Sequence, residues 1–384
     1  MAVLTECGGR SWPAVREYVL TGVLVAAVTY LLTPFVLRLA VRWHVLTEVR
    51  DRDVHTIPTP RMGGVAMFAG ICAGLLVASR LPTLQRVFDS SDAQGVLYGG
   101  GVLVLLGAAD DRWGLDALTK LAGQIVAAGV MVLQGVQLLY VPLPGGGALS
   151  LDSDLGVPIT VLFVVVTINA INFIDGLDGL AAGVVAISSL SFFAYSYELS
   201  VVHHFDRATA PTLLAAVLAG ACIGFLPHNF NPARIFMGDS GSMLLGLVFS
   251  AATVSLTGQL DPNAIGYYGL VPTLLPLLLP LALLAIPLGD LVLAVVRRSR
   301  AGQAPWAPDK QHLHHRLLTL GHSHARAVLI MYTWSALIAG GTVSLGLSHG
   351  QPLVVIAVVL AGVATLLVAT NLPRLRMISR GPRV

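Results

Sequence analysis

The feature that most constrains this chain is a series of eleven apolar segments, each long enough to cross about 30 Å of bilayer hydrocarbon. Only 11% of the 384 residues are charged and 55% are hydrophobic, whereas an average soluble protein is roughly 25% charged. The mean hydropathy is +0.79. We therefore predict an all-α polytopic integral membrane protein in which residues 1–384 form a single transmembrane domain. The predicted helices cover approximately residues 18–41, 63–80, 94–110, 117–139, 157–174, 179–197, 209–227, 242–258, 269–296, 326–347 and 351–371.

The distribution of positive charge predicts how these helices are oriented, because Lys and Arg gather in the loops on the cytoplasmic side of a membrane. With the N-terminus outside, eighteen of the 23 Lys and Arg residues fall on the inner side. The five that fall outside are Arg10, Arg16, Arg80, Arg86 and Arg207. The predicted topology is therefore N-out and C-in.

The stretch N-A-I-N-F-I-D-G-L-D-G, residues 169–179, follows an uncharged apolar run at the inner end of a predicted helix. Its two amides and two carboxylates are spaced three residues apart, at Asn169, Asn172, Asp175 and Asp178. Helical residues three apart share a face, and carboxylates in a membrane chain are kept where function needs them. We interpret the stretch as part of a site; the alternative is a polar loop between two membrane helices.

Four further polar stretches fall on the same inner side. They are residues 55–64 with His55 and Arg61, the pair Asp110-Asp111 followed by Lys120, residues 229–242 with Asn229, Phe236 and Asp239, and residues 309–317 with His312, His314, His315 and Arg316. The convergence of five polar stretches on one face predicts a functional site there. By contrast, the outer stretch 142–154 is rich in Gly and Pro, which predicts a turn or hairpin.

The aspartates of these stretches are hard oxygen ligands, which suit Mg²⁺ or Mn²⁺ rather than zinc. They are Asp110, Asp111, Asp175, Asp178 and Asp239. Since Mg²⁺ usually takes one or two carboxylates plus substrate phosphates, the remaining carboxylates should orient neighbours or handle protons. Lys120, Arg61 and the basic 312–316 stretch offer positive charge and donors for phosphate. This combination at a membrane surface predicts phosphoryl transfer to or from a lipid phosphate.

Three other interpretations stay open at this point. The Asp110-Asp111 pair could be a solvated helix cap, and the H-x-H-H pattern at residues 312–315 could bind zinc. A chain of many spans with prolines and a few carboxylates could also be a transporter. Transporter sites usually lie near the bilayer midplane, whereas these polar stretches lie at predicted helix ends. The sequence contains neither G-x-x-x-x-G-K-[ST] nor G-x-G-x-x-G, so it predicts no P-loop or Rossmann nucleotide site.

The motifs P-T-P-R-M-G-G, Asp110-Asp111, N-A-I-N-F-I-D-G-L-D-G, N-P-A-R-I-F-M-G-D-S-G-S and H-L-H-H-R, in this order, resemble those of the polyprenyl-phosphate N-acetylhexosamine-1-phosphate transferases. The resemblance covers residues 18 to 371. Within the family, the first and last motifs resemble the branch that uses UDP-N-acetylglucosamine (UDP-GlcNAc), the WecA and TagO types. The branch that transfers phospho-MurNAc-pentapeptide typically has a lysine where His55 stands and a histidine run that Leu313 interrupts here.

The resemblance implies a metal-dependent enzyme that transfers GlcNAc-1-phosphate from UDP-GlcNAc to undecaprenyl or decaprenyl phosphate and releases UMP, the first membrane step of a cell-envelope glycan pathway. It implies a Mg²⁺ cofactor, with Mn²⁺ as the alternative, and a location in the bacterial inner (cytoplasmic) membrane. Asp239 and Asp111 would ligate the metal, and Asp110 would accept a proton. The nucleotide–metal cleft would be lined by Asn169, Asn172, Asp175 and Asp178, and the uracil would meet Asn229 and Phe236. His55, Arg61, Lys120, His312, His314, His315 and Arg316 would hold phosphate or sugar. We expect no nucleic-acid partner and include a homodimer among the expected assemblies.

Overall fold

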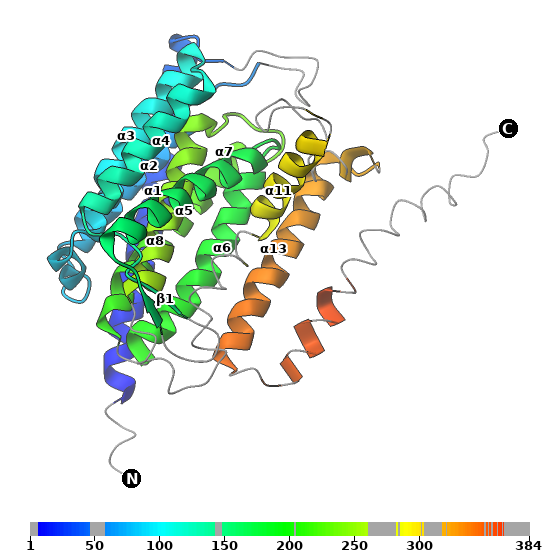
Figure 1. The fold of residues 1–384 in the computed structure, drawn as a ribbon. Coiled ribbons are helices and arrows are strands. Elements are labelled where there is room, and N and C mark those ends of the chain that lie inside the picture. The colour runs from blue at the N-terminus through cyan, green and yellow to red at the C-terminus, as the bar shows by residue number, and fades with distance from the viewer. Residues whose placement is uncertain are drawn as a thin grey trace.

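The computed structural model describes residues 7–46, 58–142, 148–202, 205–259, 285–300 and 321–348, with short stretches elsewhere between residues 282 and 364. These residues form a bundle of long helices that run roughly side by side (Figure 1). The helices are α1 (Cys7–Arg42), α2 (Gly63–Ala78), α3 (Asp92–Trp113), α4 (Ala117–Leu133), α5 (Ser153–Ile174), α6 (Leu180–Tyr197), α7 (Thr209–Asn229), α8 (Gly238–Gln259), α11 (Ala285–Arg300) and α13 (His324–Leu347). Short turns of helix at Gln85–Asp89, Glu198–Val202 and Asp206–Ala208 lie in the connections.

The polytopic helical architecture is confirmed. Within the described residues, seven helices are long and apolar enough to cross a membrane, namely α1 from Val15, α3, α5, α6, α7, α8 and α13, and α2 and α4 are shorter apolar helices. The predicted segment 269–296 falls only in part on α11, and segment 351–371 lies largely outside the described residues. The count of eleven spans and the N-out orientation therefore remain predictions.

Two helix boundaries differ from the sequence prediction, and the second of them matters for the site. Helix α4 ends at Leu133, six residues before the predicted end, because Gly135 turns the chain with φ +89°. Helix α8 begins at Gly238, four residues before the predicted start, so Asp239 lies in the first helical turn rather than in the preceding loop.

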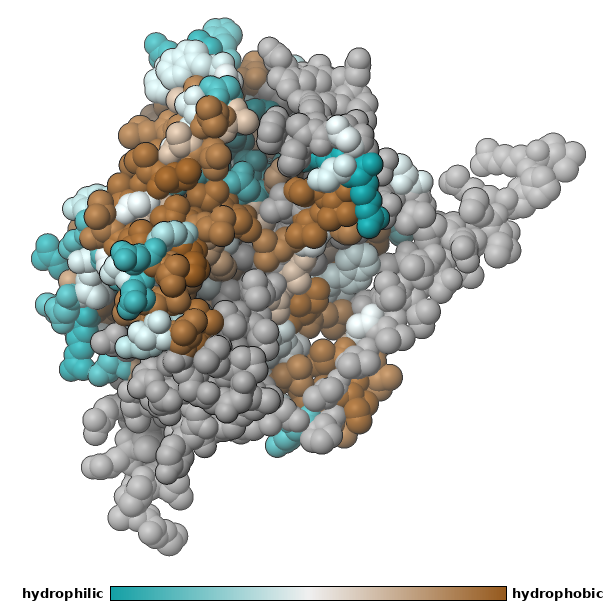
Figure 2. Space-filling model, in the orientation of Figure 1, coloured by the Kyte–Doolittle hydropathy of each residue, from teal (hydrophilic) through white to brown (hydrophobic). Residues whose placement is uncertain are grey.

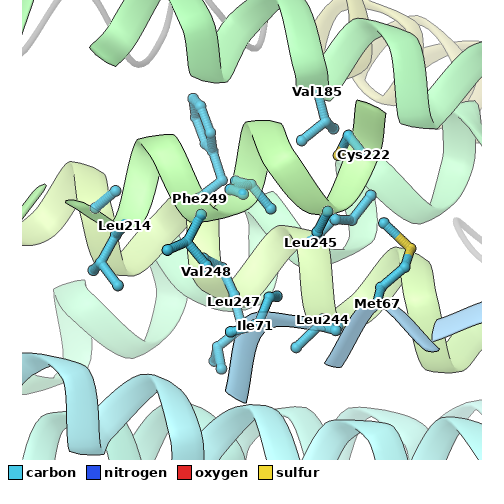
Figure 3. Packing of buried hydrophobic residues seen from close by; sticks show 14 of the residues in the cluster. Met67, Ile71, Val185, Leu214, Cys222, Leu244, Leu245, Leu247, Val248 and Phe249 are labelled. Carbon is cyan, nitrogen blue, oxygen red and sulfur yellow. The ribbon is translucent and has the colours of Figure 1, made fainter. Parts of the chain in front are cut away.

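Helix α8 is the centre of the bundle, packed against α2, α3, α5 and α7. Its apolar side chains, among them Leu244, Leu245 and Phe249, are fully buried against residues such as Met67 of α2 (Figure 3). Glycines let the neighbouring backbones come very close, as is common between membrane helices. A Cβ atom at Gly107 of α3 would lie 2.3 Å from the backbone of Ser240, and one at Gly246 would lie 2.5 Å from Cα of Ile168 on α5. The ends of α3 and α5 are therefore held against the first turns of α8.

The outer surface of the bundle is apolar over much of the face shown in Figure 2. Large side chains such as Leu31, Leu105, Leu133 and Leu162 are exposed on four different helices. Such extensive exposed apolar surface is what a lipid-facing flank requires.

A two-stranded antiparallel hairpin follows α4, with β1 (Tyr140–Pro142) paired to β2 (Ala148–Ser150). This confirms the turn or hairpin predicted for residues 142–154. The hairpin lies at the end of the bundle opposite the start of α4 (Figure 1), so it is remote from the polar helix ends described next.

Candidate active site

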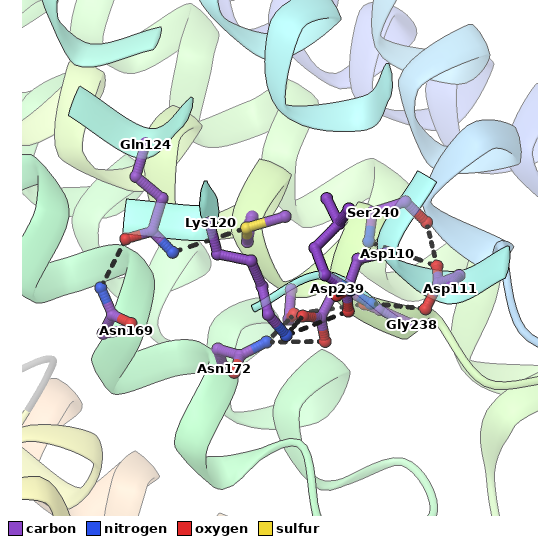
Figure 4. Close-up of polar contacts among 12 residues, drawn as sticks. Asp110, Asp111, Lys120, Gln124, Asn169, Asn172, Gly238, Asp239 and Ser240 are labelled. Atoms are coloured by element: carbon purple, nitrogen blue, oxygen red, sulfur yellow. Dashed lines mark hydrogen bonds and ion pairs between the residues drawn. The ribbon is translucent and has the colours of Figure 1, made fainter. Parts of the chain in front are cut away.

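The site is organised around Asp239 in the first turn of α8. The ammonium of Lys120, in the first turn of α4, donates to Oδ2 of Asp239 at 2.9 Å and to Oδ2 of Asp110 at 3.0 Å. The amide of Asn172, in the last turn of α5, donates to Oδ1 of Asp239 at 3.2 Å. Four helices, α3, α4, α5 and α8, thus bring charged or polar side chains to one place (Figure 4).

Asp110 is held on two sides. Its Oδ1 accepts the backbone N–H of Leu115 at 2.7 Å, just after the chain leaves α3, and its Oδ2 faces Lys120. The side chain is buried. A buried carboxylate is stable only when it is paired and hydrogen-bonded, and Asp110 is both, so its orientation toward Lys120 is well defined.

Asp111 points the other way, to the start of α8. Its Oδ1 accepts the N–H of Asp239 at 3.1 Å, and its Oδ2 accepts the Ser240 hydroxyl at 3.0 Å and the Ser240 N–H at 3.5 Å. The first N–H groups of a helix have no partner inside the helix, and the helix dipole favours negative charge there. Asp111 therefore caps α8 from a different helix and stabilises the turn that carries Asp239.

Asp175 follows the last residue of α5 and lies within the electrostatic influence of Asp239 and Arg61. Burial raises the pKa of Asp175 to about 8, and the charge of Asp239 acts in the same direction. The positive charge of Arg61 opposes this rise in pKa. Arg61 thus acts electrostatically on the same cluster from a separate loop, and its predicted contact with phosphate remains a prediction.

Asp178 and Asn229 form hydrogen bonds that connect two loops near the site. Oδ2 of Asp178 accepts the Asn231 amide at 2.9 Å and the Ala233 N–H at 3.0 Å. The amide of Asn229 is buried and engaged at both ends, accepting from Gly179 N at 3.1 Å and donating to Ile235 O at 3.0 Å. These contacts tie the turn after α5 to the loop between α7 and α8. The sequence-based prediction that Asn229 meets a uracil remains a prediction.

The P-R-M-G-G stretch pairs with the F-M-G-D stretch through the backbone. The N–H of Phe236 donates to Pro60 O at 2.8 Å, and the N–H groups of Gly63 and Gly64 donate to Phe236 O and Met237 O, both at 3.0 Å. Two motifs more than 170 residues apart in the sequence are therefore joined by backbone hydrogen bonds just before Asp239.

Several predicted site residues lie elsewhere or cannot be placed. Asn169 donates to Oε1 of Gln124 at 2.7 Å, one helical turn from Asn172, and not to the Asp239 cluster. His55, His312, His314, His315 and Arg316 lie outside the described residues. The sequence analysis missed Gln124, Ser240 and Ser242, whose hydroxyl accepts from Asn172 at 2.8 Å. Gln124 could have been found, because it lies four residues after Lys120 on the same face of an apolar helix.

The residues around Asp239 fit a magnesium ion that is held largely by water and substrate. Among the described residues, no group of three or more His, Cys, Asp or Glu side chains is placed to hold a metal ion. Mg²⁺ does not require such a cage, since it is usually bound by one or two carboxylates together with phosphates and water. The Asp239 carboxylate supplies oxygen atoms of the right kind, and the amide nitrogen of Asn172 orients it by donating to its Oδ1 at 3.2 Å.

Comparison with known proteins agrees with this chemistry. A family model described as glycosyl transferase family 4 matches residues 93–257. The decaprenyl-phosphate N-acetylglucosaminephosphotransferase of Mycolicibacterium smegmatis is 47% identical over 96% of this chain and 90% of its own. The probable undecaprenyl-phosphate N-acetylglucosaminyl 1-phosphate transferase of Bacillus subtilis is 34% identical over 79% and 77%. A phospho-N-acetylmuramoyl-pentapeptide-transferase of Desulforudis audaxviator is 34% identical over 83% and 96%.

Proposed function

Since this chain belongs to glycosyl transferase family 4, as a polyprenyl-phosphate N-acetylglucosamine-1-phosphate transferase, we propose that it transfers GlcNAc-1-phosphate from UDP-GlcNAc to decaprenyl phosphate and releases UMP. The structural observation that carries the proposal is the ion pair in which Lys120 joins Asp110 to Asp239. The identity of 47% to an enzyme named for decaprenyl phosphate supports that lipid over undecaprenyl phosphate.

In the proposed reaction, an oxygen of the lipid phosphate attacks the β-phosphorus of UDP-GlcNAc. A new P–O bond forms to the lipid phosphate, the bond between the β-phosphorus and the bridging oxygen breaks, and UMP leaves with that oxygen. The second pKa of a phosphomonoester is near 6, so much of the lipid phosphate is already a dianion at neutral pH. Asp110 is therefore needed to position the attacking group at least as much as to accept a proton.

Positioning and charge neutralisation account for most of the catalysis in such reactions. Lys120 would neutralise the transferred phosphate, since its ammonium is the cation that contacts both Asp110 and Asp239, where the phosphate and its metal ion would bind. Asp239, oriented by the Asn172 amide, would hold Mg²⁺ (or Mn²⁺), and the bound ion would offset the negative charge of the diphosphate.

Asp111 receives a different role from the one that the sequence predicts. Both of its oxygens face the first turn of α8 and accept hydrogen bonds from Asp239 and Ser240. We therefore propose that Asp111 positions Asp239 through the helix and is not itself a metal ligand. The phosphate and sugar contacts of His55, His312, His314, His315 and Arg316, and the stacking of Phe236 on uracil, stay part of the proposal on the family resemblance alone.

The chain is a multi-pass membrane protein, and its relatives are bacterial. We propose the cytoplasmic membrane as its location, with the N-terminus outside and the site on the cytoplasmic face, because that orientation leaves only five of 23 Lys and Arg residues outside.

The decisive experiment incubates purified protein with decaprenyl phosphate, Mg²⁺ and either UDP-GlcNAc or UDP-MurNAc-pentapeptide, and measures UMP. We expect UMP release with UDP-GlcNAc alone. Release only with the pentapeptide donor would move the protein to the muramoyl branch, of which one relative is 34% identical. Release of UDP in place of UMP would mean that the sugar is transferred without phosphate, and would contradict the proposed mechanism.

A further inference from the structure

Below the Asp239 cluster lies a second polar layer, built from the same three helices one turn deeper. The upper layer contains Lys120 of α4, Asn172 of α5 and Asp239 of α8. The lower layer contains Gln124, Asn169 and Met243 of the same helices, in the same order. Asn169 donates to Gln124 Oε1 at 2.7 Å, and Gln124 Nε2 lies 3.6 Å from the sulfur of Met243 (Figure 4).

The sequence spacing between the layers is that of one helical turn. Gln124 and Met243 each follow the upper residue of their helix by four positions, and Asn169 precedes Asn172 by three. Residues three or four apart on a helix lie above one another. The contact between Gln124 and Asn169 therefore lies one helical turn from Lys120 and Asn172, on the same faces of α4 and α5.

Gln124 has no role of its own in the Asp239 cluster, yet it is 4% exposed in a helix that is otherwise mostly apolar. A buried amide destabilises a membrane protein unless it is hydrogen-bonded. Leucine would pack here without that cost, but two leucines would accept many relative rotations of α4 and α5. A hydrogen bond is directional, so it permits only a few relative rotations of the two helices.

We propose that Gln124 and Asn169 are positioning residues that hold Lys120 between Asp110 and Asp239. The proposal rests on the proposed transferase reaction, since it names residues that prepare the cation for the transferred phosphate. A lysine side chain is flexible, and its ammonium is a compact point charge on a four-carbon stem. The location of that charge depends on the helix that carries it, and the Gln124–Asn169 bond links that helix to α5.

The test compares Gln124→Leu and Asn169→Leu with the exchange variant Gln124→Asn/Asn169→Gln, which keeps the total number of methylene groups between α4 and α5. Gln134→Leu at the far end of α4 is the matched control. Two quantities are measured on detergent-purified protein of known thermal midpoint. One is the steady-state rate of UMP release from UDP-GlcNAc. The other is the rate at which an amine-reactive ester acylates Lys120, followed by mass spectrometry.

We expect each single variant to lower kcat about ten- to a hundredfold while changing KM for UDP-GlcNAc by less than about twofold, because a misplaced cation weakens the reaction more than donor binding. We also expect faster acylation of Lys120, whose ammonium then spends less time between its two carboxylates. The exchange variant should restore both quantities to near the wild-type values, and Gln134→Leu should change neither.

Wild-type kcat and wild-type acylation in Gln124→Leu would overturn the proposal. So would a lower kcat that comes with a lower thermal midpoint and unchanged acylation, because that result means a role in folding alone. An exchange variant with the wild-type thermal midpoint but without restored kcat and acylation would also overturn it. If the wild-type protein releases no UMP from either donor, the proposed function fails by itself, and the acylation rates alone decide the question of positioning.

Discussion

The carboxylate of Asp111 fills the space that a side chain at Gly238 would need. A Cβ atom at Gly238 would lie 2.2 Å from Oδ2 of Asp111, and Gly238 has φ +68°, a conformation that favours glycine. The close approach of Asp111 and the positive φ of Gly238 both result from the turn that begins α8. The chain turns sharply into α8 at Gly238, and the open side of that turn is where Asp111 caps the helix that carries Asp239.

We expect Gly238→Ala to reduce UMP release by more than about tenfold and to lower the thermal midpoint. A left-handed conformation costs an alanine about 1–2 kcal/mol, and the displaced Asp111 would leave the first N–H groups of α8 without a cap. Activity and thermal midpoint of the purified variant check this. The control is Gly129→Ala on α4, where a new Cβ meets open space. Equal behaviour of the two variants would contradict the assigned role of Asp111.

We expect Asp239→Asn to nearly abolish turnover in protein that folds normally. The variant keeps an oxygen near Asn172 and Lys120, but it removes the negative charge that would attract a divalent cation. UMP release is measured across a Mg²⁺ titration, with Asp152→Asn, an exposed aspartate before α5, as the matched control. Substantial activity of Asp239→Asn at any Mg²⁺ concentration would show that the metal is assigned to the wrong residue.

Asp175 should make the stability of the metal-free protein depend on pH. Its pKa in the folded protein is raised to about 8, whereas an unperturbed aspartate has a pKa near 4. Between these two values the folded state binds more protons than the unfolded state, so stability falls as pH rises through the window. We expect the thermal midpoint in EDTA to fall from pH 5 to pH 8 in the wild type, and to fall less in Asp175→Asn.

The comparison for this prediction is again Asp152→Asn, which should follow the wild-type pH profile. Parallel profiles for all three proteins would mean that burial and the charge of Asp239 do not raise the pKa of Asp175. A smaller fall in both variants would point to a general effect of removing a carboxylate.

The spacing of residues in the sequence predicts which segments form the site, but not which neighbour each side chain contacts. The motifs correctly indicate that the loops before Gly64 and before Ser242 belong together, because each carries groups suited to phosphate. They do not separate Asp110 from Asp111, since neighbouring helical residues differ by about 100° in direction. One of the two faces Lys120 and the other caps α8. That division depends on where α8 begins, which hydropathy placed four residues too late.

The same limit applies to Asn169 and Asn172. A three-residue spacing predicts a shared face, and the two amides do share one, but they lie at different depths along the helix axis. Asn172 reaches Asp239, whereas Asn169 reaches Gln124. Hydropathy predicts the fold well because seven described helices satisfy the length and composition of a membrane span. It contains no information about which neighbour a polar side chain meets.

A proline in α1 explains the contact of His228, the residue before Asn229. Pro34 has no N–H, so the carbonyl of Tyr30, four residues earlier in the helix, lacks its usual helical donor. Nε2 of His228 lies 3.1 Å from this carbonyl oxygen, and the Tyr30 and His228 rings lie 4.7 Å apart. The imidazole therefore supplies the donor that the proline removes, and it anchors the end of α7 to α1.

We expect His228→Phe to lower the free energy of unfolding by about 1 kcal/mol, the typical net contribution of one hydrogen bond. Pro34→Ala restores the missing backbone donor, so His228→Phe should cost much less in that background. A double-mutant cycle on the thermal or denaturant midpoint measures the difference as a coupling energy. Additive effects would mean that the ring contact with Tyr30, and not the orphaned carbonyl, is what His228 contributes. A coupled result would show that the end of α7, which carries Asn229 and leads into the loop with Phe236, is anchored by a hydrogen bond that exists only because α1 contains a proline.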